Sequence, residues 1–230
     1  MVNDRTPEPS FDELRTGFTA AVSHELRTPL ARILALLEST DLPGADVHAL
    51  IDQARAEVEN TGTLIDEILF LSELESGREV VALGSTNALP VLEEVLVEHV
   101  DAAARAGVNL EASGDPDIDL PLRPRMLRIL AENLVENAIR YAGHGSTFRI
   151  DVARGEGVVT LTCSDDGPGV SEADLNRLFE RFWRADTARA SRGTGLGLAI
   201  VKHVTAAAGG TVEARSRLGH GLEVRCVFPE

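Results

Sequence analysis

The sequence predicts a two-part protein, in which an α-helical hairpin is followed by an α/β two-layer sandwich. Up to about residue 80, apolar side chains recur at helical spacing and no strand pattern is visible. From residue 81 onward, helical and strand-like runs are mixed, as is typical of a two-layer α/β fold. The chain has 230 residues, 43% of them hydrophobic, which is enough for both parts and ordinary for a folded protein.

The first part is expected to consist of two long amphipathic helices. One apolar stripe comprises Phe18, Val22, Leu26, Leu30, Ile33 and Leu37. A second comprises Val47, Ile51, Ala54, Val58, Thr61, Ile65 and Leu69. The segment 41–46, which contains Pro43 and Gly44, predicts a turn between them and hence an antiparallel hairpin. Since one hairpin cannot bury both stripes, the simplest arrangement is a symmetric dimer that forms a four-helix bundle.

The second part is expected to alternate helices and strands around a sheet. Helices are predicted over residues 90–106, 124–142 and 197–208. Strands are predicted over residues 108–110, 148–153, 158–164, 211–216 and 223–228. The glycine-containing segments 154–157 and 218–221 predict two hairpin turns.

Charge and composition restrict the partners. The net charge is −15, from 22 basic and 37 acidic residues, so the chain repels polyanions and no nucleic acid partner is expected. No apolar run is long enough to span a membrane, so membrane attachment is expected only through segments absent from this chain.

Cys163 and Cys226 are expected to be buried, reduced thiols. The six histidines are scattered, which makes a zinc site improbable.

Chemistry is first indicated in residues 23–30, Ser-His-Glu-Leu-Arg-Thr-Pro-Leu. His24 lies on the side of the helix opposite the apolar stripe, where a neutral imidazole can act as a nucleophile. Glu25 could accept the ring proton or orient the ring, and Thr28 lies one turn later on the same face. Pro29 removes a backbone N–H and permits a bend. A His-Glu-x-x-His zinc motif is excluded because Thr28 occupies the second histidine position.

Four further motifs follow along the chain. They are the asparagine motif, Asn133-Leu134-Val135-Glu136-Asn137-Ala138-Ile139-Arg140-Tyr141, and the first glycine motif, Asp165-Asp166-Gly167-Pro168-Gly169. The aromatic motif (residues 178–186) and the second glycine motif (residues 193–202) follow. With the His24 segment and in this order, they make the sequence, from about residue 15 to its end, resemble the sensor histidine kinases of two-component signalling. The resemblance implies a Bergerat-type ATP-binding fold for the second part.

A nucleotide site is expected where these motifs meet. Three glycines precede an apolar helix at residue 197, so backbone N–H groups can cradle phosphates. Asn137 can supply a neutral oxygen ligand to Mg²⁺. The resemblance implies that Asp165 accepts a hydrogen bond from the adenine amine, and that Gly167 and Gly169 let the backbone approach the base. The expected nucleotide-binding residues are Asn133, Asn137, Arg140, Tyr141, Asp165, Gly167, Gly169, Arg184, Gly193, Thr194, Gly195, Leu196, Gly197 and Leu198.

Some positions leave alternatives open. Arg184 is either a partner for the terminal phosphate or an exposed arginine in a lid. The aromatic side chains Phe179, Phe182 and Trp183 fit lid packing better than base stacking. Leu222 occupies a position where the family often has Ser or Thr, and no catalytic consequence is expected.

The resemblance implies ATP-dependent autophosphorylation of His24, with Glu25 and Thr28 as further catalytic residues. The phosphoryl group would then pass to an aspartate of a response-regulator receiver domain. Dephosphorylation of that regulator, with Thr28 positioning a water, is also implied.

ATP and Mg²⁺ are the expected ligands. The protein is expected to be a homodimer in the cytoplasm, as the cytoplasmic part of a membrane-bound sensor. The expected domains are a linker (1–9), a dimerisation and phosphotransfer hairpin (10–80) and a catalytic ATP-binding domain (81–230).

Two other functions share part of this pattern. The first is a gyrase-like ATPase or an ATP-gated clamp, in which the position of Asn133 is a glutamate that activates water. Asn133 cannot act as a base, and Glu136 points about 100° away from Asn137. The second is a catalytically silent dimerisation module, which the presence of Asn137, Asp165 and the glycines disfavours.

Overall fold

The computed structural model describes residues 11–76, 84–185 and 193–230, with residues 11–19 described as helical backbone only. The expected linker over residues 1–9 and the expected domain boundary at residue 80 lie outside these ranges. Contacts divide the chain into two compact units, and the division falls within one long helix, after Ile68. No helix in the described part of the chain combines the length and apolar character needed to cross a bilayer.

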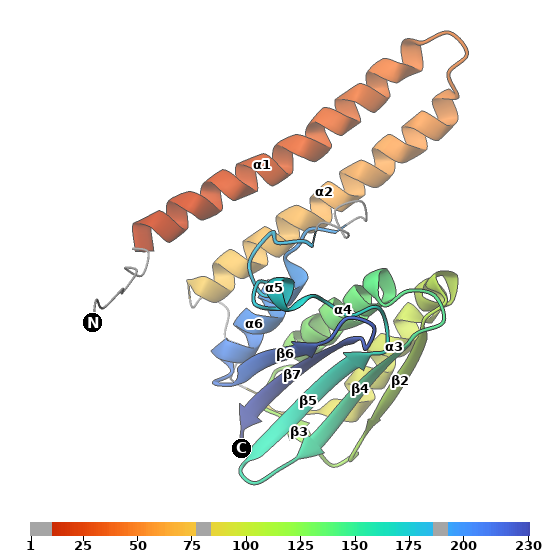
Figure 1. The fold of residues 1–230 in the computed structure, drawn as a ribbon. Helices are drawn as coiled ribbons and strands as arrows, with labels where there is room; N and C mark the ends of the chain where they lie inside the picture. Colours follow the sequence, from red (N-terminus) through yellow and green to blue (C-terminus); the bar gives the residue numbers. More distant parts are fainter. Residues whose placement is uncertain (1–10, 77–83, 186–192) are drawn as a thin grey trace. The chain divides into compact units, whose positions relative to one another are not determined.

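The first unit is the predicted helical hairpin. Helix α1 (Phe11–Glu38) ends in the 3₁₀ turn η1 (Ser39–Asp41), and helix α2 (Val47–Glu75) returns antiparallel to it (Figure 1). Asp46 caps α2, because its Oδ1 accepts a hydrogen bond from the N–H of Ala49 at 3.1 Å. Gly44 has φ +82° in the connecting turn, a conformation that favours glycine.

Much of the apolar surface of the described hairpin is exposed. Leu30 is 58% exposed and Val58 is 56% exposed. Other large apolar side chains that stay exposed are Leu34, Leu37, Val47, Ile51 and Ile65. Contiguous exposed apolar surface of this kind is typical of a face that another chain covers.

The second unit contains a five-stranded sheet in the order β2-β4-β5-β7-β6. Its strands are β2 (Asn109–Gly114), β4 (Thr147–Arg154), β5 (Val158–Asp165), β6 (Thr211–Ser216) and β7 (Leu222–Pro229). Strands β2 and β4 pair in parallel, and the other neighbours pair antiparallel. The predicted hairpins between β4 and β5 and between β6 and β7 are therefore confirmed.

Three helices cover one face of this sheet: α3 (Ala88–Ala106), α4 (Pro124–Tyr141) and α6 (Gly197–Ala207) (Figure 1). Alternate strand residues such as Ile150, Leu161 and Phe228 are buried beneath them, while their neighbours in sequence face outward. Cys163 and Cys226 lie in this core as free thiols, and burial raises the pKa of both. The predicted fold class, a helical hairpin followed by an α/β sandwich, is confirmed.

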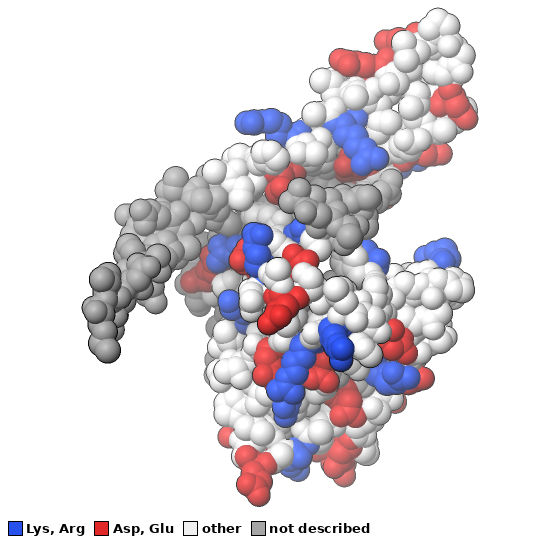
Figure 2. Space-filling view, viewed as in Figure 1, with Lys and Arg blue, Asp and Glu red and all other residues white. Residues whose placement is uncertain are grey.

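The other face of the sheet is open and carries paired charges. Acidic and basic side chains are interspersed over it (Figure 2). Arg149 Nε lies 2.9 Å from Glu111 Oε2 across β2 and β4, and Arg154 Nε lies 2.9 Å from Glu230 Oε1. Such exposed pairs contribute little to stability but leave mixed charge on this face.

Three short elements were not predicted from the sequence. Strands β1 (Thr86–Asn87) and β3 (Asp119–Leu120) pair antiparallel with each other, and α5 (Glu172–Leu175) is a single turn. The strand predicted over residues 108–110 begins one residue later and runs to Gly114. Two-residue strands and single turns are too short to show a hydrophobic period, so only the tertiary context reveals them.

Candidate active site

The His24 segment lies in the middle of α1. The side chain of His24 is 77% exposed, as expected from its position opposite the apolar stripe. Its Nδ1 lies 3.7 Å from Oε1 of Glu25, which is close enough for electrostatic attraction but longer than a hydrogen bond. Because Glu25 lies beside Nδ1, the other ring nitrogen, Nε2, is the one left open to an incoming group.

Thr28 lies one turn after His24 and is linked to it through the backbone. Its hydroxyl donates to the carbonyl oxygen of His24 at 3.3 Å, a bond that threonine often makes within a helix. Thr28 itself is exposed. Pro29 follows inside α1, and the helix continues through it to Glu38. His24, Glu25 and Thr28 thus share one exposed segment of the hairpin.

The asparagine motif lies on α4. Asn133 and Asn137 are one helical turn apart and half-buried, while Ala131 and Val135 on the opposite side of the helix are buried in the core. The amide of Asn133 donates to the carbonyl oxygen of Ile129 at 2.7 Å, which fixes its orientation. Because its side chain is an amide, Asn133 cannot act as a base.

The second glycine motif packs directly against α4. A Cβ atom on Gly197 would lie 2.7 Å from Oδ1 of Asn133, and one on Gly193 would lie 2.9 Å from Nη1 of Arg140 and 3.2 Å from the hydroxyl of Tyr141. These distances are shorter than ordinary contacts, so a side chain at either glycine would displace the facing ends of these side chains. The structure thus brings the two motifs together, as the shared nucleotide site predicts.

The start of α6 offers backbone donors. The first intrahelical bond runs from the N–H of Ile200 to the carbonyl oxygen of Leu196, so the N–H groups of Gly197 and Leu198 precede the helical ladder. The N–H of Leu196 is bonded to the hydroxyl of Thr194 at 3.3 Å. Free N–H groups at the N-terminus of an eleven-residue helix are suited to binding phosphate oxygens.

The aromatic motif contacts the same loop. The N–H of Phe182 donates to the carbonyl oxygen of Gly195 at 2.9 Å. Phe182 has φ +61°, which is strained for a bulky residue, and Gly195 has φ +72°. The guanidinium of Arg177 lies 5.6 Å from the ring centre of Trp183, so this ring packs within the motif. Asp186, at the end of the motif, lies outside the described residues.

Gly195→Ala is expected to weaken ADP binding about tenfold or more. The new Cβ would lie 2.8 Å from the backbone carbon of Phe182, and an L-residue in the left-handed conformation adds about 1–2 kcal/mol of strain. The loop and the aromatic motif must therefore move apart. Isothermal titration calorimetry of ADP measures the effect.

Gly157→Ala is the matched control for this substitution. Gly157 has φ +70° in the β4–β5 turn, and a Cβ there would meet nothing within 4 Å. Gly157→Ala therefore reproduces the strain of a left-handed alanine without a clash against a neighbouring segment. If both variants bind ADP equally well, the contact between Gly195 and Phe182 has no role in the site.

The first glycine motif follows β5. A Cβ on Gly167 would lie 2.4 Å from the carbonyl oxygen of Ala142, just beyond the end of α4, so the motif closes against the helix that carries the asparagines. Asp165, at its start, is half-buried, and its Oδ1 accepts a hydrogen bond from the N–H of Gly167 at 2.9 Å. Burial raises the pKa of Asp165, while hydrogen bonds from the N–H groups of Gly167 and Leu222 oppose the rise.

The acidic residues of α4 are already paired. Glu136 Oε2 lies 3.7 Å from Nη2 of Arg140, and Glu132 Oε1 lies 3.7 Å from Nη1 of Arg128. Burial raises the pKa of Glu132. Both contacts are longer than a hydrogen bond, and the Glu136 side chain is 53% exposed.

The site offers few ligands for a metal ion. Within residues 11–76, 84–185 and 193–230 no cluster of three or more His, Cys, Asp or Glu side chains could hold one. Asn137 offers one neutral oxygen. This set fits Mg²⁺, which commonly takes few protein ligands and completes its shell with phosphate oxygens and water.

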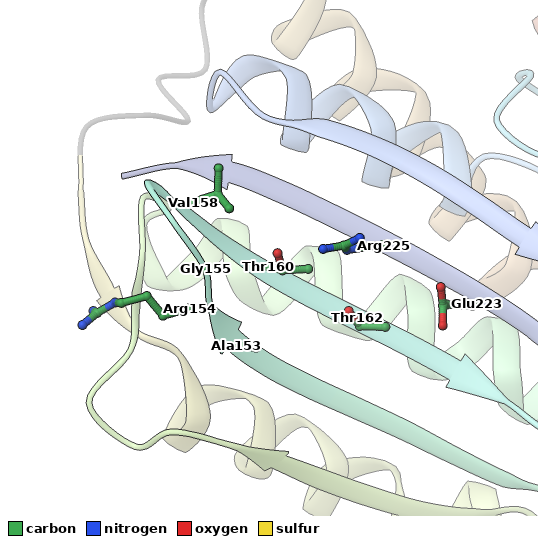
Figure 3. A pocket seen from close by; sticks show the side chains of 8 residues that line it. All are labelled: Ala153, Arg154, Gly155, Val158, Thr160, Thr162, Glu223 and Arg225. Carbon is green, nitrogen blue, oxygen red and sulfur yellow. The ribbon is translucent and has the colours of Figure 1, made fainter.

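A depression on the open sheet face is a separate feature. It is lined by residues of β4, β5 and β7 and the turn between β4 and β5, among them Thr160, Thr162 and Arg225 (Figure 3). None of its lining residues belongs to the five motifs, so it is not the candidate active site.

Two residues next to the site were not singled out from the sequence. A Cβ on Gly221 would lie 1.7 Å from the carbonyl oxygen of Asp165, so the backbone of the β6–β7 turn rests on the first glycine motif. The hydroxyl of Ser216 bonds to both segments, with Val170 and Gly221 as its partners. The paired glycines at 219 and 221 signalled a turn, but nothing in the sequence places that turn beside Asp165.

Comparisons with known proteins agree with this geometry. Residues 14–77 match the family model "His Kinase A (phospho-acceptor) domain", and residues 122–230 match "Histidine kinase-, DNA gyrase B-, and HSP90-like ATPase". The sensor-like histidine kinase SenX3 of Mycobacterium tuberculosis is 32% identical over 235 residues, an alignment that covers 100% of this chain. The chain spans only 57% of the length of that relative.

Two solved structures are similar over most of the chain. Acinetobacter baumannii histidine kinase AdeS has a TM-score of 0.75 at 24% identity, covering 90% of this chain and 97% of that one. Full-length ShkA in complex with AMPPNP has a TM-score of 0.69 at 28% identity, covering 91% of this chain and 45% of that one.

Proposed function

The chain belongs to the sensor histidine kinases of two-component signalling, and from this premise we propose that it transfers the γ-phosphoryl group of ATP to His24. The single observation that carries the proposal is the convergence of the asparagine and glycine motifs on one site, in a chain that also exposes His24 beside Glu25. ShkA, a relative in fold and sequence, is bound to the ATP analogue AMPPNP, which supports a nucleotide at this site.

We propose the following roles for the nucleotide-binding residues. Asp165 accepts a hydrogen bond from the adenine amine, and the close backbone approach at Gly167 makes room for the base. The N–H groups at the start of α6 hold the phosphates. Asn137 would hold Mg²⁺, which neutralises phosphate charge when bound. Arg184 is a candidate partner of the terminal phosphate.

Transfer begins at Nε2 of His24. Its lone pair attacks the γ-phosphorus, an N–P bond forms, the bond to the bridging oxygen breaks and ADP leaves. Glu25, 3.7 Å from Nδ1, stabilises the positive charge on the ring and can take its proton. The phosphoramidate then passes to an aspartate of a response-regulator receiver domain, where an O–P bond replaces the N–P bond.

Hydrolysis of ATP is disfavoured by the residues around Asn137. Asn133 cannot act as a base, and Glu136 points about 100° away from Asn137 around the helix. A water near the γ-phosphate therefore has no carboxylate at position 133 to remove its proton. This favours a kinase over the gyrase-like ATPase or clamp.

We also propose a homodimer and a domain division. The exposed apolar stripe of the hairpin, including Leu30 and Val58, would be covered by a second copy in a four-helix bundle. Residues 10–80 are proposed to form the dimerisation and phosphotransfer domain, and residues 81–230 the catalytic domain. The reaction is placed in the cytoplasm, where ATP and response regulators are found.

One incubation with γ-labelled ATP and Mg²⁺ tests the proposed function. A kinase gives label on the protein that is stable in alkali and lost in acid. A gyrase-like ATPase gives free labelled phosphate without labelled protein, and a silent module gives neither. Either of the last two results contradicts the proposal.

Thr28→Ala is expected to keep autophosphorylation but to slow the dephosphorylation of the cognate regulator. The Thr28 hydroxyl lies one turn along the face that carries His24, where it can hold a water in line with a phosphoryl group on a docked partner. Loss of that hydrogen bond is expected to raise the barrier by about 1.5–3 kcal/mol, or roughly tenfold to a hundredfold in rate. A time course of phospho-regulator decay with ADP and Mg²⁺ measures it.

Thr28→Ser is the control for this prediction, because it keeps the hydroxyl. It should restore decay to near the wild-type rate. Equal decay rates for wild type and Thr28→Ala, with autophosphorylation unchanged, would remove the phosphatase role and leave the kinase assignment intact.

A further inference from the structure

The loop that begins with Asp165 is tied to the β6–β7 turn, here defined as residues 216–222. The N–H of Gly219 donates to the carbonyl oxygen of Pro168 at 2.7 Å, and the N–H of Gly221 donates to that of Gly167 at 2.9 Å. The position of the first glycine motif therefore depends on a turn that lies about fifty residues later in the sequence.

Ser216 completes this connection with its side chain. It is the last residue of β6 and is half-buried. Its Oγ donates to the carbonyl oxygen of Gly221 at 2.6 Å and accepts from the N–H of Val170 at 2.7 Å. A serine hydroxyl has one proton to donate, and here it uses that proton and a lone pair to hold both segments at once.

The packing between these segments leaves little room for adjustment. Gly221 has φ +75°, and a Cβ there would lie 1.7 Å from the carbonyl oxygen of Asp165. The N–H of Leu222 favours the charged Asp165 carboxylate and opposes the rise of its pKa, and Leu222 pairs with Ser216 in the β6–β7 ladder. A shift of this turn would therefore move both the backbone on which Asp165 rests and one of the donors to its carboxylate.

We propose that Ser216 is a positioning residue for base recognition: its hydroxyl holds the 165–170 loop against the β6–β7 turn, so that the Asp165 carboxylate is aimed at the adenine amine. This rests on the proposed function, in which Asp165 binds adenine. Ser216 does not touch the base itself and acts through Val170, Gly221 and Leu222.

Ser113 provides a contrast within the same sheet. It lies on β2, is exposed and makes one hydrogen bond, from its Oγ to Oδ1 of Asp151 at 2.7 Å. That bond links two outward-facing residues and joins no segment of the candidate site. Ser113→Ala therefore removes a serine hydrogen bond from the sheet without disturbing the Asp165 loop.

The test compares Ser216→Ala, Ser216→Thr and Ser113→Ala with the wild-type chain. ADP and GDP compete against a fluorescent ADP analogue, and thermal unfolding is followed without nucleotide. Ser216→Ala is expected to weaken ADP binding about tenfold, with little change for GDP, so that the preference for ADP over GDP falls by a similar factor. Ser216→Thr keeps the hydroxyl and should restore most of the preference, and Ser113→Ala should leave it unchanged.

Each other outcome counts against the inference. Wild-type affinity and preference in Ser216→Ala would overturn it. Equal weakening of ADP and GDP together with a lower unfolding temperature would mean that Ser216 only stabilises the fold, which also overturns it. Failure of the wild-type chain to bind ADP would instead overturn the proposed nucleotide site, and this inference with it.

Discussion

His24→Ala is expected to abolish phosphate incorporation while ADP still binds with wild-type affinity. His24 is the proposed nucleophile, and alanine offers no atom that can accept the phosphoryl group. The substitution lies on the exposed face of α1, so the fold of the hairpin should be unaffected. Labelling with γ-labelled ATP measures the first effect, and calorimetry of ADP measures the second.

His48→Ala is the matched control. His48 is also exposed and lies on α2 of the same hairpin, but it is not part of the 23–30 motif. The His48→Ala variant should be labelled as strongly as the wild type. Label at the wild-type level in His24→Ala, or its loss in His48→Ala alone, would show that the phosphoacceptor has been wrongly assigned.

Asp165→Asn is expected to weaken ADP binding about a hundredfold, equivalent to about 2.7 kcal/mol, and to reduce labelling to background at micromolar ATP. The amide has the shape of the carboxylate, so the loop should keep its backbone. The asparagine side chain has an NH₂ donor in place of one carboxylate oxygen. This donor would face another donor, either the N–H of Leu222 or the adenine amine. Calorimetry of ADP and the labelling assay measure both effects.

Asp166→Asn is the neighbouring control. The side chain of Asp166 is 52% exposed, and its Oδ1 accepts from the N–H of Thr147 at 2.6 Å, a bond that the amide oxygen can retain. It should bind ADP like the wild type. Normal ADP binding by Asp165→Asn would mean that the nucleotide site has been misplaced.

Mixing Asp165→Asn with His24→Ala separates two routes of transfer. One variant keeps the acceptor histidine and the other keeps the nucleotide site. If mixed dimers become labelled, the phosphoryl group passes between protomers. Absence of label from mixed dimers that are shown to form means transfer within one protomer.

The long elements of the fold could be predicted from sequence because their patterns are long. Residues 211–216 were predicted as a strand, and β6 has those bounds. Helix α4 begins at Pro124 as predicted, since proline is well suited to the first helical position. By contrast, α5 is a single turn capped by Ser171, and β2 gains its full length from parallel pairing with β4. The length of β2 depends on a distant strand, whereas α5 is too short to show a hydrophobic period.

The candidate site shows the same division. The glycines at 193, 195 and 197 could be assigned to a phosphate loop from their spacing, but not to contacts with Asn133 and Phe182. Ser216 could not be assigned to the site at all, because Val170, whose N–H donates to its hydroxyl, is 46 positions away in the sequence. Spacing indicates which residues act together, and packing decides which residues hold them in place.

The central claim is tested most directly by locating the phosphoryl group on the chain. After incubation with ATP and Mg²⁺, the protein is digested at neutral or alkaline pH and its peptides are sequenced by mass spectrometry with fragmentation that preserves N–P bonds. We expect one phosphorylated site, His24, whose modification disappears after brief acid treatment. A phosphoryl group on another residue, or ADP formation with no modified peptide, would contradict it.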